Sequence, residues 1–337
     1  MLLPLIIINL LLLVAFLPQI MVSQDTGLSY GIFASLTALL MFGYWRNRLN
    51  LASQIVGTRS TANIVLLKLK RNKAAMGGLI IVIMLIYIAI LAPFIVPVDP
   101  LAMDWGALSQ GPSAEHWLGS DDLGRDTLSR TIYGTRIALG IGLLAVFLNT
   151  IMGTGLGLLA GYYGGKTDNI IMRSLEFWNA IPFILMAIAL MAALGSGLFN
   201  LILVVSLTGI LEFARIIRGD SMLLRSADYV NAARVMGIPD NQIITRHILP
   251  NCLAPTIVMA TLRVGETILT IAGLSFLGLG VQPPTASLGA MLASGQQFLH
   301  QSLAMSLVPG AIILLIVLAF NLFGDGLRDA LDSKIGQ

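Results

Sequence analysis

The chain has 337 residues, of which 56% are hydrophobic and only 11% charged, and its mean hydropathy is +0.86. Soluble domains carry roughly 25% charged residues, so this composition excludes an ordinary soluble domain and indicates a membrane protein with several spans. The formal net charge of +3 is too small to indicate a nucleic-acid partner, and the single cysteine, Cys252, excludes an intramolecular disulfide and a cysteine-based metal cluster.

Eight segments are long and apolar enough to cross a bilayer, which takes about 20 mostly apolar residues. In chain order they are 2–22, 28–45, 76–98, 137–165, 170–194, 198–217, 255–280 and 302–324. The apolar run 177–211 is too long for one span, and we expect Gly195-Ser196-Gly197 to divide it. The sequence therefore predicts an all-α polytopic membrane protein with about eight transmembrane helices.

The first two spans form an N-terminal hairpin, 1–50, with a short loop that holds Asp25. A cleaved signal peptide over 1–22 is the alternative. It is disfavoured because no positive charge precedes the apolar run and no A-x-A-like cleavage site follows it.

The positions of Lys and Arg predict the orientation, because these residues gather in cytoplasmic loops. Segment 46–73 holds seven basic and no acidic residues, whereas segment 99–130 holds six acidic and two basic residues. Segment 215–250 is again rich in Arg, and loop 281–301 has no Lys or Arg. Every loop agrees with one topology, in which both termini are cytoplasmic.

Three regions follow from this pattern. Region 1–50 is the extra hairpin, region 51–135 is a basic linker with one span and an acidic external segment, and region 136–335 is a block of five spans with a cytoplasmic loop. Gly153 and Gly157 have the G-x-x-x-G spacing that favours close helix packing in lipid. They do not form a nucleotide-binding loop, because no strand precedes them.

The external segment is densest in charge at 116–126, where we expect Asp121 or Asp122 to cap a helix that begins near Leu123. One histidine with several aspartates is compatible with a metal site, but a solvated acidic loop explains these charges equally well. We predict no metal site and no cofactor.

Four ionisable residues fall within predicted spans: Glu176, Glu212, Arg263 and Glu266. Such residues are costly in a membrane and often functional. Arg263 and Glu266 are three residues apart on one helical face, so we expect them to pair. Two interpretations stay open. In the first, Arg263 and Glu266 form an internal ion pair, while Glu176 and Glu212 lie at helix ends near water. In the second, the four residues are part of a polar translocation path. A proton-coupled carrier would need more acids near the middle of the membrane.

No pattern of catalytic residues is present. His116, His247 and His300 are scattered, and the metalloprotease, nucleophile-elbow and Walker motifs are missing from the sequence. We therefore predict no catalytic residue and no enzymatic activity in this chain.

The loop 218–250 contains what we call the bracket, residues 227–250. We expect a helix over 227–236 that ends at Gly237, and a second helix that Asp240 caps and Pro250 ends. The small side chains of Ala232 and Ala233 would allow the backbone of another protein to come close. A connector without a special role is the alternative.

The bracket resembles the coupling loop of ATP-binding-cassette (ABC) importer permeases, whose pattern is E-A-A, three residues, Gly, nine residues, I-x-L-P. The positions that match are Ala232, Ala233, Gly237, Leu249 and Pro250. Asn231 replaces the acidic residue and His247 replaces the first Ile. We expect Asp228, three residues before Asn231, to supply the missing charge at the interface with the ATPase.

Five further stretches resemble the C-type inner-membrane permease of the dipeptide, oligopeptide and nickel ABC importer family. They are residues 116–126, 169–173, 246–251, 274–284 and 319–332, and the resemblance covers about 65–335. Residues 1–55 have no counterpart in the usual six-span form. Ile271 and Leu288 stand where relatives often carry Glu and Trp.

The resemblance implies the type I, MetI-like transmembrane fold of ABC importers, in the cytoplasmic (inner) membrane of a bacterium or archaeon. It implies four kinds of partner: a homologous B-type permease, two cytoplasmic ATPases, an extracytoplasmic solute-binding protein and membrane lipid. It implies no contact with nucleic acid. ATP hydrolysis would then belong to the ATPases. Di- and oligopeptides are the expected substrates, with nickel chelates, glutathione or other peptide-like solutes as alternatives. A secondary carrier that works without an ATPase is the alternative of a different class.

Overall fold

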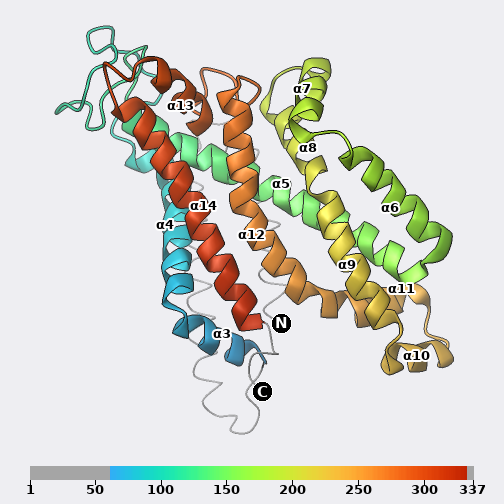
Figure 1. The fold of residues 1–337 in the computed structure, drawn as a ribbon. Coiled ribbons are helices and arrows are strands. Elements are labelled where there is room, and N and C mark those ends of the chain that lie inside the picture. Colours follow the sequence, from blue (N-terminus) through green and yellow to red (C-terminus); the bar gives the residue numbers. More distant parts are fainter. Residues whose placement is uncertain (1–60, 332–337) are drawn as a thin grey trace.

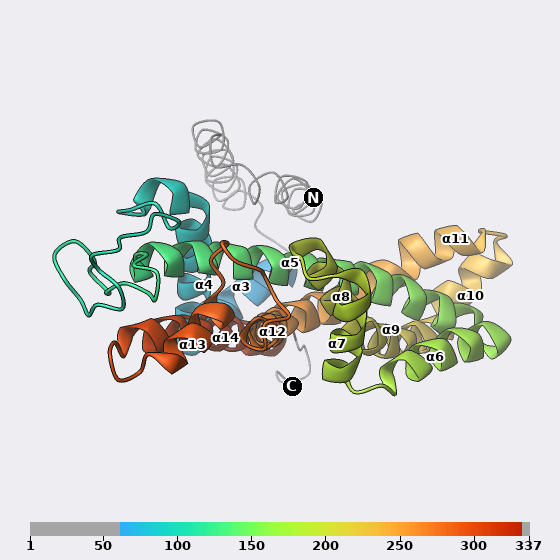
Figure 2. The same cartoon turned by 90° about the horizontal axis from the view of Figure 1, so that it is seen from above.

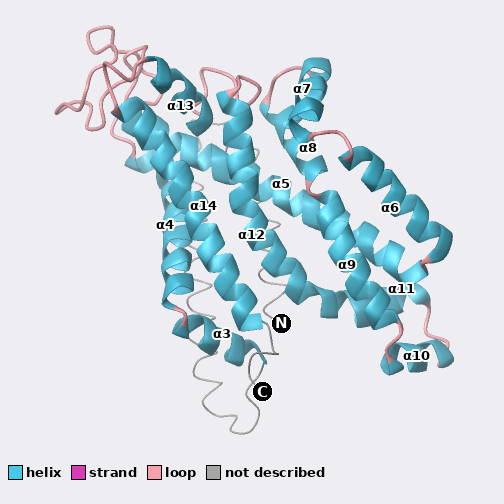
Figure 3. Cartoon of the chain, viewed as in Figure 1, coloured by secondary structure: helices cyan, strands magenta, loops and turns pink. Residues whose placement is uncertain are grey.

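The computed structural model describes residues 61–331, and this range is helical without a named β-strand (Figure 3). The all-α prediction is confirmed for the described residues. The predicted spans 2–22 and 28–45, and with them the N-terminal hairpin, lie outside this range.

The helices follow the chain as labelled in Figure 1. They are α3 (Thr61–Arg71), α4 (Lys73–Ile95), α5 (Thr127–Tyr163), α6 (Gly165–Asn179), α7 (Phe183–Leu194), α8 (Leu198–Thr208), α9 (Ile210–Arg225), α10 (Asp228–Val235), α11 (Asp240–Ile243), the π-helix η1 (Ile244–Ile248), α12 (Leu249–Phe276), α13 (Leu288–Gln297) and α14 (Ala304–Leu331).

Five helical runs among the described residues are long and apolar enough to cross a membrane. They are Lys73–Ile95, Thr127–Tyr163, Leu198–Arg225, Asp240–Phe276 and Ala304–Leu331. The pair α6 and α7 qualifies as a sixth if it crosses as one broken span. When this pair is counted as one span, the described residues have the six spans that we expect after the hairpin.

The predicted span 170–194 is not one continuous helix, because α6 and α7 meet at an angle of 85°. Pro182 precedes α7 with φ −54°. Proline has no N–H for the helical ladder and disfavours helical geometry in the residue before it, so the helix breaks there. The break expected at Gly195 is confirmed: α7 ends at Leu194, and Gly195 has φ +85°.

Two predicted helix ends are also corrected. Pro250 does not end the second bracket helix, since the run Asp240–Phe276 passes through it. In the wider turn of η1, the Leu249 N–H donates to the Ile244 carbonyl five residues back, and proline is tolerated in the first turn of α12 that follows. At the external segment, the helix begins at Thr127 and not near Leu123, with Asp126 as its cap.

Two apolar cores hold the spans together. In one, Val82 of α4, Leu139 of α5, Ile268 of α12 and Ile316 of α14 pack together. In the other, α5 and α12 pack against α7 and α8. The long helix α5 contributes to both, and Figure 2 shows it running the length of the molecule. The division of the chain into regions at 50 and 135 stays a prediction.

α5 and α9 pack at close range through glycines of α5. A Cβ atom placed on Gly157 would lie 2.6 Å from the Ala214 carbonyl oxygen of α9, and one on Gly153 would lie 2.8 Å from the Ile210 carbonyl oxygen. The predicted role of this G-x-x-x-G spacing in helix packing is confirmed.

We expect Gly157→Ala to lower the melting temperature of the purified protein, because the new methyl group meets backbone that cannot move aside. Overpacking of this kind costs about 1–3 kcal/mol. Gly155→Ala is the matched control, since nothing lies within 4 Å of a Cβ there and alanine favours the helix. Equal melting temperatures for the two variants would contradict the close approach of α5 and α9.

Candidate functional site

The bracket lies at one end of the molecule in Figure 1, with α11 beside the lower ends of α5 and α9 and α10 below them. It consists of α10, a turn at Gly237, α11 and η1. From η1 the chain continues directly into α12, so the bracket is joined to the spans at both of its ends.

A small apolar core fixes the bracket to these spans. Val230 and Ala233 of α10 and Ile243 of α11 are buried against Tyr162 of α5 and Ile217 of α9. Leu249 packs partly buried against the same core. A displacement of α10 must therefore displace the ends of α5 and α9, or break this core.

Polar contacts reinforce the attachment. The Tyr162 hydroxyl donates to the Asp240 carboxylate at 2.6 Å, and the Arg234 guanidinium lies over the Tyr162 ring, 5.1 Å from its centre. The expected capping by Asp240 is wrong: Pro239 is the N-cap residue of α11, and no side chain caps this helix. The Asp240 carboxylate contacts α5 instead.

Gly237 ends α10 as predicted. It follows the last turn with φ +78°, a left-handed conformation that costs glycine little. Its N–H donates to the Arg234 carbonyl at 2.9 Å, and the Ile238 N–H donates to the Ala233 carbonyl at 3.1 Å. This is the Schellman pattern of helix ends, and it sets the sharp turn between α10 and α11.

The adjacent alanines of α10 have different surroundings. Ala233 is 1% exposed and belongs to the bracket's own core, and its role in coupling stays a prediction. Ala232 is exposed, as are Asp228 and Asn231, and Pro250 is exposed at the far end. The Asn231 amide donates to the Ser226 carbonyl at 3.3 Å, at the start of α10. We call the surface of Asp228, Asn231 and Ala232 the outer face of α10.

One contact of the bracket was not predicted from the sequence. The rings of Tyr229 and His247 lie 6.5 Å apart, and the Asn251 amide donates to the His247 carbonyl at 2.6 Å. His247, which departs from the expected pattern, thus joins α10 to the start of α12. The sequence singles out stretch 246–251, which contains His247 and Asn251, but it does not show that His247 faces Tyr229 of α10.

Three of the four ionisable residues that were predicted within spans meet between α9 and α12. The Arg263 guanidinium lies 2.6 Å from the Glu212 carboxylate and also pairs with Glu266, as the spacing predicted. Glu176 is not part of this group, which we call the charged triad, since it lies 3.5 Å from Arg173 on the exposed surface of α6. The pairing with Glu212 could not be seen in the sequence, because 51 residues separate it from Arg263.

Two cavities share the charged triad. The larger, of about 820 Å³, lies between α9, α12 and α14. The smaller, of about 320 Å³, extends from the triad to the bend between α6 and α7. The triad therefore lies where the two cavities adjoin.

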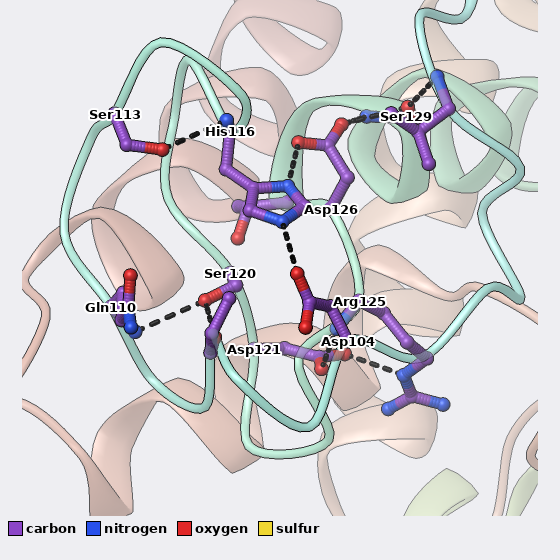
Figure 4. A network of polar contacts seen from close by, with 12 residues as sticks. Asp104, Gln110, Ser113, His116, Ser120, Asp121, Arg125, Asp126 and Ser129 are labelled. Carbon is purple, nitrogen blue, oxygen red and sulfur yellow. Dashed lines mark hydrogen bonds and ion pairs between the residues drawn. The ribbon is translucent and has the colours of Figure 1, made fainter.

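At the opposite end of the molecule, the external segment is held by its own charges (Figure 4). The His116 ring lies 3.1 Å from Asp126 and 3.9 Å from Asp104. Asp121 pairs with Arg125 at 2.7 Å and with Arg130 of α5 at 3.2 Å. Within residues 61–331, no group of three or more His, Cys, Asp or Glu is arranged to hold a metal ion. These charges fasten the segment to the start of α5.

Two family models match the chain. The model described as binding-protein-dependent transport system inner membrane component matches residues 153–337. The model described as N-terminal TM domain of oligopeptide transport permease C matches residues 60–112.

Several proteins are similar to the chain over most of its length. The dipeptide transport system permease protein DppC of Alkalihalophilus pseudofirmus is 46% identical over 268 residues, which are 80% of this chain and 88% of that protein. The glutathione transport system permease protein GsiD of Pectobacterium atrosepticum is also 46% identical, over 79% of this chain and 89% of its own. Among solved structures, an inward-facing form of the methionine ABC transporter MetNI covers 60% of this chain and 97% of its own, with a TM-score of 0.49 and 19% identity.

Proposed function

The chain belongs to the family of binding-protein-dependent transport system inner membrane components, and on this premise we propose that it is the C-type permease subunit of an ABC importer for di- or oligopeptides. The observation that supports peptides most directly is the 46% identity to a dipeptide permease over 80% of this chain. An equally similar relative is a glutathione permease, so import of glutathione, itself a small peptide, is the second candidate.

The proposed assembly has four further components. A homologous B-type permease completes the path, two cytoplasmic ATPases bind below, and an extracytoplasmic binding protein delivers the peptide. ATP hydrolysis belongs to the ATPases. The chain lies in the inner membrane with the bracket and both termini on the cytoplasmic side, in agreement with the positions of Lys and Arg.

Coupling then follows from the attachment of the bracket. An ATPase binds the outer face of α10, and closure of the ATPases on ATP moves α10. Because Val230 and Ala233 share a core with α5 and α9, these spans move with it. Rocking of packed helices about a central site changes the side of the membrane to which the path is open.

The proposal is tested with the complete complex in lipid vesicles, with the binding protein outside and ATP inside. We expect uptake of radiolabelled dialanine or glutathione that requires ATP and the ATPase subunits. The preference between the two ligands decides between the two candidates. Comparable uptake by this chain without ATPase subunits would show a secondary carrier and contradict the proposal.

We expect Ala232→Trp to uncouple the complex, because an indole on the outer face of α10 keeps the ATPase from approaching. The ATPase activity stimulated by loaded binding protein should fall about tenfold or more, which is about 1.4 kcal/mol of lost interaction. The melting temperature should not change, because Ala232 is exposed.

Ala233→Trp is the contrasting variant. It should lower the melting temperature, because the indole does not fit the core of the bracket. If Ala232→Trp kept the stimulated ATPase activity of the wild type, the outer face of α10 would not be part of the interface with the ATPase.

Asp228 is proposed to supply the negative charge that Asn231 lacks, since both are exposed on α10. Asp228→Asn should therefore lower the stimulated ATPase activity, with a smaller loss at high salt, where exposed charges are screened. An unchanged activity in Asp228→Asn, together with a strong loss in Asn231→Ala, would assign the polar contact to Asn231.

A further inference from the structure

The charged triad lies deep in the membrane-spanning part of the chain. Arg263 stands at the midpoint of α12, Leu249–Phe276. Its side chain is only 14% exposed, whereas Glu212 and Glu266 are 48% and 64% exposed. A charge that faces lipid at this depth is costly, so the carboxylates must face water or another protein.

The larger cavity carries opposite charges at its two ends. The triad lies at one end, and its two carboxylates and one guanidinium have a formal charge of −1. Arg328, three residues before α14 ends at Leu331, lines the other end. Within residues 61–331 Arg328 has no ion pair, and its neighbours Asp325 and Asp329 do not line the cavity.

Apolar side chains line the wall between these ends. Val258 and Leu262 of α12, Ile216 of α9 and Val317 of α14 are among them. A cavity of about 820 Å³ with mostly apolar walls and few polar groups has the character of a small-molecule site. The polar groups would fix the orientation of a ligand, and the apolar wall would accept varied side chains.

The helical rise gives the separation, along the axis of α14, between the level of the charged triad and Arg328. A Cβ on Gly265 would lie 3.5 Å from the Asn321 side-chain oxygen, so Asn321 of α14 lies level with the triad region of α12. Arg328 is seven residues further along α14, which is about 10 Å at 1.5 Å per residue. An extended peptide spans about 3.3–3.6 Å per residue, so three residues cover this distance.

We propose that this cavity is a binding site for a short zwitterionic peptide of about three residues, with its α-ammonium group at Glu212 and Glu266 and its carboxylate at Arg328. The proposal rests on the proposed function as a peptide importer and adds the site and the groups that it recognises. The smaller cavity is lined by the same triad, so a ligand that moves between the cavities passes the two carboxylates.

The site is tested by equilibrium binding to the purified complete complex without binding protein or nucleotide, so that recognition by the binding protein does not contribute. The probes are radiolabelled trialanine, N-acetyl-trialanine and trialanine amide. In the wild type, we expect acetylation and amidation each to weaken binding about tenfold, since each removes one charge from the peptide.

The variants separate the two ends of the site. Glu212→Gln and Glu266→Gln each leave Arg263 one carboxylate partner, and each should abolish the difference between trialanine and its acetylated form. Arg328→Gln should abolish only the difference caused by amidation. Glu176→Gln is the matched control, because Glu176 lies outside both cavities, and it should behave as the wild type.

Equal affinity of the wild type for all three probes, or no saturable binding of trialanine, would overturn the site. ATP-driven uptake of dialanine by the same preparation would then show that the proposed function still holds. A preparation that transports no peptide at all would contradict the proposed function itself.

Discussion

A membrane protein that is driven from outside needs a rigid connection between its driven surface and its spans. In the proposed coupling, that connection is the apolar core in which Val230 and Ala233 of α10 pack against Tyr162 of α5 and Ile217 of α9. The Schellman turn at Gly237 and the contact between Tyr162 and Asp240 hold the bracket in one orientation over this core. The adjacent alanines differ in their surroundings: Ala233 packs in the core, and Ala232 presents a small side chain on the outer face of α10.

The same demand for close approach continues into the membrane. The glycines of α5 bring its backbone against α9, so the two helices that hold the bracket also hold each other. Because lipid offers no hydrophobic drive for helix association, close contact between backbones is a main source of attraction within the bilayer. In the proposed coupling, a movement of α10 would therefore reach two helices that are packed closely against each other.

Sequence reasoning succeeded where one local property decides the structure. Apolar length located the five continuous spans of residues 61–331, Gly237 located the end of α10, and the three-residue spacing of Arg263 and Glu266 located an ion pair. It failed where distant residues decide. Nothing local shows that Glu212 reaches Arg263, or that Ala233 faces inward while Ala232 faces outward. It also failed at prolines, because Pro182 breaks its span whereas Pro250 is accommodated after a π-turn.

The exposure of the triad bears on how firmly a ligand should be held. An importer must release what it carries, so its site in the membrane has to bind more weakly than the protein that delivers the ligand. Glu212 and Glu266 are half-exposed and already share Arg263, so water and the guanidinium both weaken their attraction for an ammonium group. A fully buried and unpaired carboxylate would be costly in the empty state and would hold the peptide too long. A partly neutralised pair avoids both problems, because Arg263 stabilises the carboxylates when the cavity is empty and leaves one negative charge to select the peptide's amino end.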